Sequence, residues 1–402
     1  MNPKPNPIIT IGNICFRAAI LRPEYKIEKL NEIKMNAIIK SLISLVVTLN
    51  IVLKYLILYI KVFSKYLIMH IKNILNDMEK DNVQAYLLTQ FTNIQYISNY
   101  KPTSFAFCVI KENPIIYVSS MDMEIAKRDS SIEVKEYVKF DEMIGELKKE
   151  GIKNLAIEPG LVYSTYEKFK DDFNVSSKKY IEKERMIKSS LEIENITKAT
   201  EIAQTAFREL DVANRSENEN VLAFDLVRLM IENGASSESF DTILVSGAST
   251  SLPHAVPQAK KLKTPILIDW GAKYNGYCSD NTRTIVYTEK EHEIFDIVRE
   301  AHDKAIKAIK PGLKCCEIDK VARDIIVEYG YGDNFIHSTG HSLGLDIHET
   351  PGFSVRDDTI IEKGMVLTIE PGIYLEGKFG VRLEDTVSID RKAHVIGDLP
   401  LL

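Results

Sequence analysis

Residues 266–287 read ILIDWGAKYNGYCSDNTRTIVY, and this stretch predicts the fold of the region around it. Two β-rich runs flank a Tyr-Asn-Gly turn, which is typical of a β-hairpin. A two-residue turn at Asn275–Gly276 places Asp280 opposite Gly271, one diagonal step from Asp269, and a small bulge would set both carboxylates side by side. The apolar run before Asp269 indicates burial, and two buried like charges are costly unless a cation neutralises them. The alternative is a solvated hairpin with two surface aspartates.

Three of the eight histidines fall in residues 337–351, HSTGHSLGLDIHETP. His337 and His341 are spaced as in zinc-binding HExxH helices, but a serine stands where that motif has its glutamate, and two nearby glycines weaken any helix. Glycines beside histidines suit a loop or strand whose backbone approaches a ligand closely. The pattern therefore favours a site that includes His348 as well, and the alternative is three unrelated hydrogen-bonded histidines.

A third stretch, residues 366–387, reads VLTIEPGIYLEGKFGVRLEDTV. Glu370 ends an apolar strand at a Pro-Gly turn, and Glu384 lies inside a second predicted strand, Gly380–Val387. Strand alternation places Arg382 on the same face as Glu384. Read alone, both glutamates could be carboxylates at strand edges.

Taken together, four carboxylates and one histidine lie on β-rich runs beside glycine turns: Asp269, Asp280, His341, Glu370 and Glu384. This set carries too much charge for one ion and suits two divalent ions bridged by carboxylates. Oxygen ligands with a single imidazole favour Mn²⁺, Co²⁺ or Fe²⁺ over a structural zinc. His254, in the loop sequence SGASTSLPHAVP, is the other candidate for chemistry.

The order of these residues, with DxG, GHxxG, EPG and RxED motifs, resembles the M24 metallopeptidases of pita-bread fold. Within that family the chain is similar to the Xaa-Pro dipeptidases (prolidases) and Xaa-Pro aminopeptidases. The resemblance covers about residues 70–402 and implies an α+β protein. An N-terminal α/β layered domain, residues 69–187, would precede a C-terminal pita-bread catalytic domain, residues 188–402.

The resemblance also implies a mechanism in which a metal-bridging hydroxide attacks the Xaa-Pro bond at the N-terminus of dipeptides or short peptides. Two divalent ions per chain are expected, Mn²⁺ or Co²⁺ first, with Zn²⁺ or Fe²⁺ as alternatives. Asp269 would bind one ion and His341 the other, while the remaining three carboxylates would bind both. Catalytic roles would fall to Glu370, as proton shuttle, and to His254 and His348. Substrate contacts are expected from His254, His337, His348 and Arg382.

Rival functions use the same fold. A non-catalytic pita-bread binding module should lack some of the five ligand residues, which this chain retains, and methionine aminopeptidases usually lack the preceding α/β domain. The partners expected are a peptide with proline in second position and a second copy of the chain. Three other histidines, His292, His302 and His394, match no motif and are interpreted as surface residues.

The 402 residues are enough for two or three domains, and 45% hydrophobic with 27% charged residues is the composition of a globular protein. The net charge of −6 divides into +7 for residues 1–68 and −13 for residues 69–402, which argues against a nucleic-acid partner. Five sparse cysteines without a CxxC pair favour a reducing, cytoplasmic location.

Residues 1–68 form an extension of different composition. A membrane helix at about residues 41–60 is one interpretation, but the uncharged core Ser41–Leu53 has 13 residues, short of the ~20 that span a bilayer. Membrane anchoring and membrane contact would apply only if residues 38–63 are such an anchor. An upstream translation artefact is a second interpretation, because a normally patterned segment opens at Met69, and a soluble extension is a third.

Periodicity predicts an alternation of helices and strands before the domain boundary near Arg185–Ser190. The predicted helices are Ile71–Lys80, Met121–Asp129, Asp141–Glu150 and Tyr163–Phe173, and the predicted strands are Ala85–Thr89, Phe105–Ile110, Ile115–Ser119, Ile132–Tyr137 and Asn154–Ile157. Such alternation implies a parallel or mixed sheet. Further helices are expected at Glu192–Leu210, Glu217–Asn233, Glu291–Ile309 and Cys316–Tyr329.

Overall fold

The computed structural model describes residues 10–11, 14–15, 44, 69–212 and 218–401. The chain divides into two compact units, Met1–Tyr66 and Leu67–Leu402. In the first, strands β1 (Thr10–Ile11) and β2 (Ile14–Cys15) pair antiparallel. Apart from Ser44, the membrane helix considered at residues 41–60 lies outside the described residues. Where the structure describes the chain, no helix is long and apolar enough to cross a membrane.

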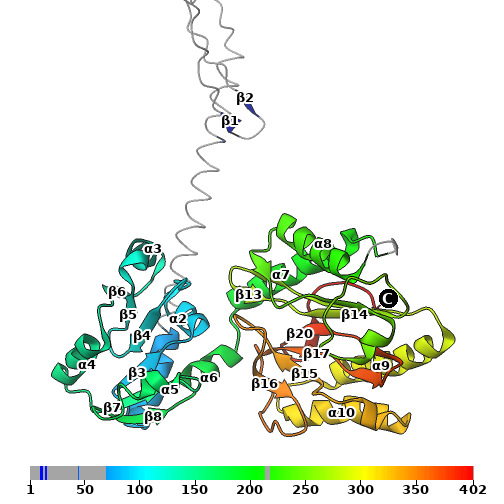
Figure 1. Ribbon diagram of the computed structural model, residues 1–402. Coiled ribbons are helices and arrows are strands. Elements are labelled where there is room, and N and C mark those ends of the chain that lie inside the picture. Colours follow the sequence, from blue (N-terminus) through cyan, green and yellow to red (C-terminus); the bar gives the residue numbers. More distant parts are fainter. Residues whose placement is uncertain (1–9, 12–13, 16–43, 45–68, 213–217, 402) are drawn as a thin grey trace, which may run out of the picture. The chain divides into compact units, whose positions relative to one another are not determined.

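The second unit opens with helical residues 69–80 and a six-stranded mixed sheet of order β6-β5-β4-β3-β7-β8 (Figure 1). The strands are β3 (Ala85–Leu88), β4 (Ala106–Ile110), β5 (Ile115–Val118), β6 (Glu133–Glu136), β7 (Asn154–Ile157) and β8 (Asn174–Ser177). The helices are α2 (Phe91–Ser98), η1 (Ser120–Asp122), α3 (Met123–Asp129), α4 (Phe140–Lys149), α5 (Tyr163–Tyr166) and α6 (Tyr180–Met186). Both parallel and antiparallel pairs occur, as predicted.

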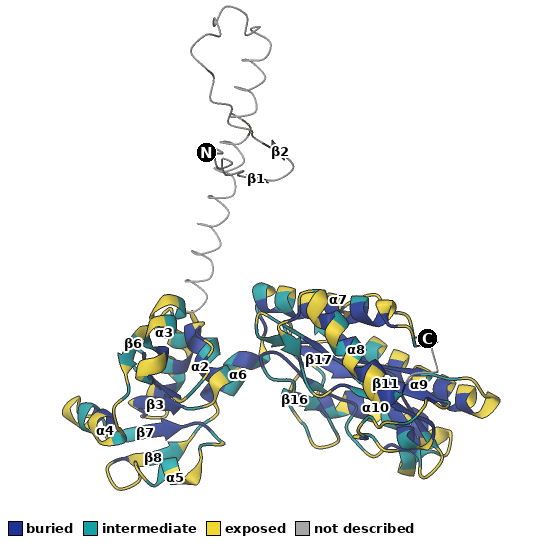
Figure 2. Cartoon of the chain, turned by 45° about the horizontal axis from the view of Figure 1, so that its top comes forward, coloured by how far each residue is buried: buried dark blue, intermediate teal, exposed yellow. Residues whose placement is uncertain are grey.

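Strand alternation gives this sheet a hydrophobic core on each face. In β3, Tyr86 and Leu88 join the core under residues 69–80, α2 and α3, whereas Ala85 and Leu87 join the core under α4. All four side chains are buried, because a strand covered on both faces can be apolar throughout. Figure 2 shows these strands in the colour of buried residues, between helices whose outer faces are exposed.

After α6, a short segment leads into helix α7, which begins at a capping box formed by Ser189 and Glu192. The helices here are α7 (Ser190–Glu209), α8 (Glu219–Glu232), η2 (Gly247–Ser251), α9 (Glu289–Ala308), α10 (Cys315–Glu328) and η3 (Gly332–Asn334). Helices α7 and α8 share one hydrophobic core with β11 (Ile266–Trp270), and α9 and α10 share another with β17 (Val366–Ile369) and β20 (Asp385–Ile389). The two helix pairs thus lie on opposite sides of the strands (Figure 1).

The strands between these helix pairs form small antiparallel sheets, of orders β10-β11-β14, β13-β12-β9, β16-β15-β17-β20-β21 and β18-β19. Their bounds are β9 (Ser237–Glu238), β10 (Ile243–Ser246), β11 (Ile266–Trp270), β12 (Ala272–Tyr274), β13 (Tyr277–Cys278), β14 (Asn281–Ile285), β15 (Gly340–Ser342), β16 (Glu349–Phe353), β17 (Val366–Ile369), β18 (Gly372–Leu375), β19 (Phe379–Arg382), β20 (Asp385–Ile389) and β21 (Ala393–Val395). The expected α+β class is confirmed.

Several predicted elements need correction. The helix predicted at Tyr163–Phe173 is confined to α5, because turns follow it, and α2, β8 and α6 were not predicted. The strand predicted at Gly380–Val387 is split into β19 and β20. The predicted start of α8 at Glu217 lies outside the described residues.

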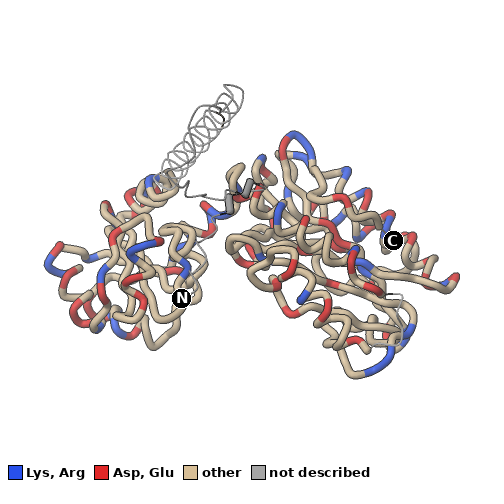
Figure 3. The backbone as a smooth tube through the Cα atoms, turned by 90° about the horizontal axis from the view of Figure 1, so that it is seen from above, with Lys and Arg blue, Asp and Glu red and all other residues tan. Residues whose placement is uncertain are grey.

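Charged residues of both signs are interspersed along the described backbone (Figure 3). The cysteines whose side chains are described, Cys108, Cys278, Cys315 and Cys316, are free thiols.

Candidate active site

The first hairpin forms as predicted, apart from its bulge. Asn275 and Gly276 both have positive φ, 48° and 87°, which a tight hairpin turn requires. The strand pairing is interrupted at Gly271 and at Ser279 and Asp280. Tyr274 pairs with Tyr277 on one side of this break, and Asp269 pairs with Thr282 on the other, so the register is the same on both sides. The predicted bulge is therefore wrong. Plain alternation already places Asp269, Asp280 and Thr282 on one face.

The second hairpin, formed by β17 and β18 with β19 and β20, has a similar break in its middle. Ile369 pairs with Asp385 before the break, and Gly372 pairs with Arg382 after it. Continuing this register places Glu370 opposite Glu384. A bridge joins the two hairpins there, because the N–H of Glu384 donates to the carbonyl of Thr282 at 3.0 Å.

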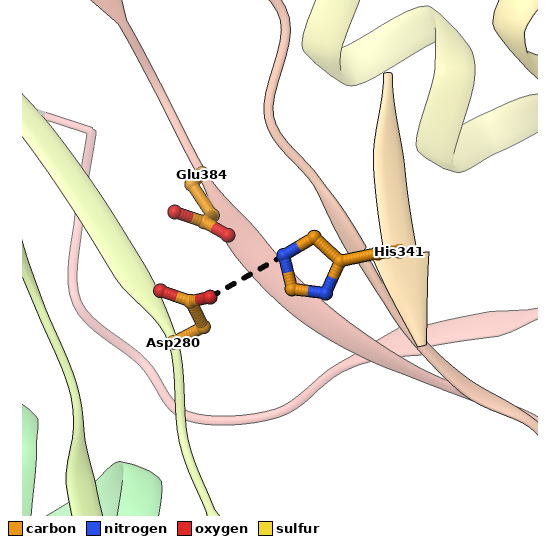
Figure 4. A group of neighbouring side chains, drawn as sticks. All are labelled: Asp280, His341 and Glu384. Atoms are coloured by element: carbon orange, nitrogen blue, oxygen red, sulfur yellow. Dashed lines mark ion pairs between the residues drawn. The ribbon is translucent and has the colours of Figure 1, made fainter. Parts of the chain in front are cut away.

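Strands β15 and β16 bring the histidines to these carboxylates. The rings of His341 and His348 meet edge to face, with centroids 4.4 Å apart. His341 Nε2 lies 3.6 Å from Asp280 Oδ2 and 3.5 Å from Glu370 Oε1. Asp280, His341 and Glu384 each offer a ligand atom within 4.8 Å of the others (Figure 4). Residues more than a hundred positions apart in sequence thus converge on one point.

Burial gives this cluster unusual electrostatics. Asp280 and Glu384 are 5% and 1% exposed. Burial, followed by repulsion from neighbouring carboxylates, raises the pKa of both side chains well above ordinary values. Burial also raises the pKa of Glu370 and lowers the pKa of His341, so His341 is held as the neutral imidazole that ligates metals.

Three oxygens of the cluster have no hydrogen-bond partner among the described residues: Asp269 Oδ1, Asp280 Oδ1 and Glu384 Oε1. An unpaired buried carboxylate oxygen is costly, and a divalent cation is the partner that such oxygens accept. The cluster therefore fits a divalent metal site.

Arg382 connects this cluster to a residue that the sequence did not single out. Its Nη2 donates to Asp269 Oδ2 at 2.6 Å and its Nη1 to the Tyr374 hydroxyl at 2.7 Å. His337 Nε2 lies 2.9 Å from the same hydroxyl. Tyr374 follows Glu370 by four residues, so strand alternation could have indicated that it shares the face of Glu370.

All nine predicted site residues line one cavity of about 510 Å³. His254 and His348 are exposed on its wall. The residues not predicted for this wall are Phe240, Asp241, Thr242, Ile243, Pro253, Ala255, Val256, Pro257, Ser338 and Ile347. Apolar side chains therefore line the same cavity as the cluster of carboxylates and histidines.

The histidines outside the motifs differ from one another. His292 and His394 are exposed, as predicted, but the surface interpretation of His302 is wrong. His302 is 2% exposed because helical spacing places it with Val298 and Ala305 on the buried face of α9. Its Nε2 lies 3.3 Å from Asp385 Oδ2.

Comparison with known proteins accounts for both parts of the second unit. Residues 194–391 match the model of metallopeptidase family M24, and residues 70–187 match the creatinase/prolidase N-terminal domain. The Xaa-Pro dipeptidase of Pyrococcus horikoshii is 41% identical over 332 residues, which are 80% of this chain and 94% of that protein.

Solved structures agree. The prolidase from Pyrococcus furiosus superposes with a TM-score of 0.76 at 39% identity, covering 81% of this chain and 99% of that one. The X-Pro aminopeptidase of Thermotoga maritima superposes with a TM-score of 0.77 at 32% identity, covering 82% and 98%. With its creatinase-type N-terminal domain and its catalytic domain, the chain belongs to metallopeptidase family M24.

Proposed function

We propose that this metallopeptidase hydrolyses the bond between an N-terminal residue and proline, in dipeptides or short peptides. The observation that carries the proposal is the convergence of four carboxylates and a histidine, with three unpaired oxygens, on a cavity lined by further histidines. The 41% sequence identity with the Pyrococcus horikoshii Xaa-Pro dipeptidase supports proline as the second residue of the substrate.

Asp269, Asp280, His341, Glu370 and Glu384 would hold two divalent ions, with Mn²⁺ or Co²⁺ preferred because oxygen ligands dominate the set. When bound, such ions generate a nucleophile from water at neutral pH and polarise the scissile carbonyl. Asp269 is suited to its part because Arg382 fixes one of its oxygens and leaves the other unpaired among the described residues.

The side chains of the chain supply the remaining steps. Glu370, whose pKa is raised by burial, would take a proton from the attacking water and deliver it to the departing proline nitrogen. His254 and His348 would donate hydrogen bonds to the substrate carbonyl as negative charge develops on its oxygen. His337 and Arg382 would complete the polar wall. The apolar wall that includes Phe240, Ile243 and Ile347 suits the ring of proline.

Hydrolysis rates test this function directly. The protein, loaded in turn with Mn²⁺, Co²⁺ and Zn²⁺, is given Ala-Pro, Ala-Pro-Ala and Met-Ala-Ser. We expect cleavage of the proline peptides only, because the apolar side chains of the cavity suit the proline ring. A general peptidase, which requires the backbone N–H that proline lacks, would leave both proline peptides intact. Ready cleavage of Met-Ala-Ser with both proline peptides intact would contradict the proposal and favour a methionine aminopeptidase-like enzyme.

Three further features belong to this proposal. We infer that the chain acts as a homodimer, which sedimentation analysis tests. A cytoplasmic location is supported by the four free thiols and tested by cell fractionation. We also propose domain boundaries at residues 69–187 and 188–402, and the ranges matched by the two family models, 70–187 and 194–391, support them.

A further inference from the structure

Two buried cations lie in the short segment between the two domains. Arg185 is in the last turn of α6, and Lys188 directly precedes the cap of α7. Their side chains are only 7% and 1% exposed. Burying a cation is costly unless an anion compensates its charge. The anionic partners of Arg185 and Lys188 therefore identify the part of the chain that these two residues hold in place.

Both cations bind Glu349, the first residue of β16. Arg185 Nη2 donates to Glu349 Oε1 at 2.5 Å, and Lys188 Nζ donates to Glu349 Oε2 at 3.2 Å. Lys188 Nζ also donates to Ser342 Oγ at 2.8 Å, and Arg185 Nη2 to Asp346 Oδ2 at 2.8 Å. We call Arg185, Lys188 and Glu349 the linker clamp.

The linker clamp holds strands β15 and β16 next to the site histidines. Ser342 pairs with Glu349 between β15 and β16, and each is the sequence neighbour of a site histidine, His341 and His348 respectively. Neither Ser342 nor Glu349 lines the active-site cavity, whereas both histidines do. His341 lies in β15 and His348 directly precedes β16, so the clamp holds the backbone beside both histidines, at a point where the register of the two strands shifts. Arg185, Glu349 and His348 also line another cavity, of about 340 Å³.

The N-terminal domain supports the clamp in turn. Arg185 Nη1 donates to Asn93 Oδ1 at 2.6 Å, and Asn93 Nδ2 donates to the buried carboxylate of Glu158 at 2.8 Å. On one side the clamp is closely packed, because a Cβ at Gly344 would lie 2.5 Å from Glu349 Oε1. The guanidinium fork of Arg185 thus joins Glu349 to Asn93 of the N-terminal domain.

We propose that Glu349, held by Arg185 and Lys188, is a positioning residue that sets His341 and His348 in the active site. The N-terminal domain would then act on catalysis through Arg185, although Arg185 lies outside the active-site cavity. For its effect on catalysis, the inference rests on the proposed function.

The test uses Arg185→Lys, which keeps the charge but loses the fork, and Glu349→Gln, which keeps the shape but loses the charge. Glu291→Gln is the matched control: Glu291 is another buried carboxylate, at the start of α9, that accepts from the backbone N–H of Thr288 and does not line the cavity. Steady-state rates on Ala-Pro are measured for each metal-loaded protein. Ring NMR signals of the histidines are measured in the metal-free proteins, with exposed His394 as internal reference.

Both clamp variants should lower kcat about tenfold or more, with KM changed less than about twofold, as is usual for groups that orient metal ligands. The ring signals of His341 and His348 should shift in the clamp variants but not in Glu291→Gln. If Glu349→Gln does not fold, Arg185→Lys carries the test alone. Unchanged kcat and ring signals, or a loss of kcat that only follows the unfolded fraction, would overturn the proposal. A wild type inactive on every Xaa-Pro peptide would reject the proposed function, while the ring signals would still test the positioning.

Discussion

Asp269 shows how single atoms prepare the site. Arg382 donates to its Oδ2, which fixes the orientation of the carboxylate, while Oδ1 has no partner among the described residues. The two carboxylate oxygens of Glu384 differ in the same manner, because Thr282 Oγ1 donates to Oε2 at 2.7 Å and Oε1 is left unpaired in the described structure. Each carboxylate thus has one oxygen that orients it and one that can bind a cation.

Crowding of these carboxylates predicts an unusual dependence of stability on pH. The pKa of Glu384 is raised in the folded metal-free protein, so the folded state binds more protons than the unfolded state between the ordinary glutamate pKa and the raised value. Stability contributed by this group therefore increases as the pH falls through that window and is lost as the pH rises.

Glu384→Gln removes one of these charges. At pH 7 and without metal, we expect the variant to be more stable than the wild type, by on the order of 1 kcal/mol or more, since one pKa unit corresponds to about 1.4 kcal/mol. Urea unfolding in a chelating buffer measures the difference, which should shrink toward pH 5. A metal-free variant less stable than the wild type at pH 7 would show that the crowding is not costly.

At the scale of elements, the site depends on two hairpins that are broken where their carboxylates meet. Gly271 makes the first break possible, because a Cβ there would lie 1.9 Å from the carbonyl oxygen of Ser279. Ser279 immediately precedes Asp280, so the close approach of the two backbones sets the position of that ligand candidate.

Gly271→Ala should therefore separate the strands and displace Asp280. We expect a loss of about 1–3 kcal/mol of stability, as for other overpacked positions, and a more than tenfold loss of Xaa-Pro hydrolysis. Gly145→Ala is the matched control, because nothing lies within 4 Å of a Cβ at that position in α4, and it should add about 0.5–1 kcal/mol without changing the rate. If both variants had the same stability and the same hydrolysis rate, the close approach at Gly271 would not be what positions Asp280.

The sequence predicted many of these elements, for physical reasons. Carboxylates at glycine-flanked strand ends can be recognised from the sequence alone, and the turn at Asn275–Gly276 fixes the register of its hairpin. The breaks could not be predicted, because register and alternation are the same with or without them. Helix α2 was missed because its buried face includes the polar residues Asn93 and Ser98. His302 was misassigned because it matches no motif, although the helix predicted at Glu291–Ile309 places it on the same face as the buried Val298 and Ala305.

At the scale of the whole molecule, the matched family models lie within residues 70–391. Every residue of the candidate site and of the linker clamp falls inside this range. Function should therefore not require the N-terminal extension of residues 1–68.

We predict that a protein beginning at Met69 folds and hydrolyses Ala-Pro with the kcat of the full chain. Its thermal unfolding midpoint should also agree, because the contacts of the site lie within residues 69–401. Side-by-side rates and melting curves of both proteins provide the check. An insoluble or inactive shorter protein beside an active full chain would instead make residues 1–68 structural.

We expect the cluster of four carboxylates and His341 to perform Xaa-Pro hydrolysis with bound divalent ions. A titration of the metal-free protein with Mn²⁺ tests this, with bound metal per chain and the rate on Ala-Pro measured on the same samples. We predict that the rate rises with occupancy to a limit at two ions per chain, and that Asp280→Ala binds at least one ion fewer and is inactive. Full hydrolysis of Ala-Pro by wild-type protein without bound divalent metal would contradict this expectation.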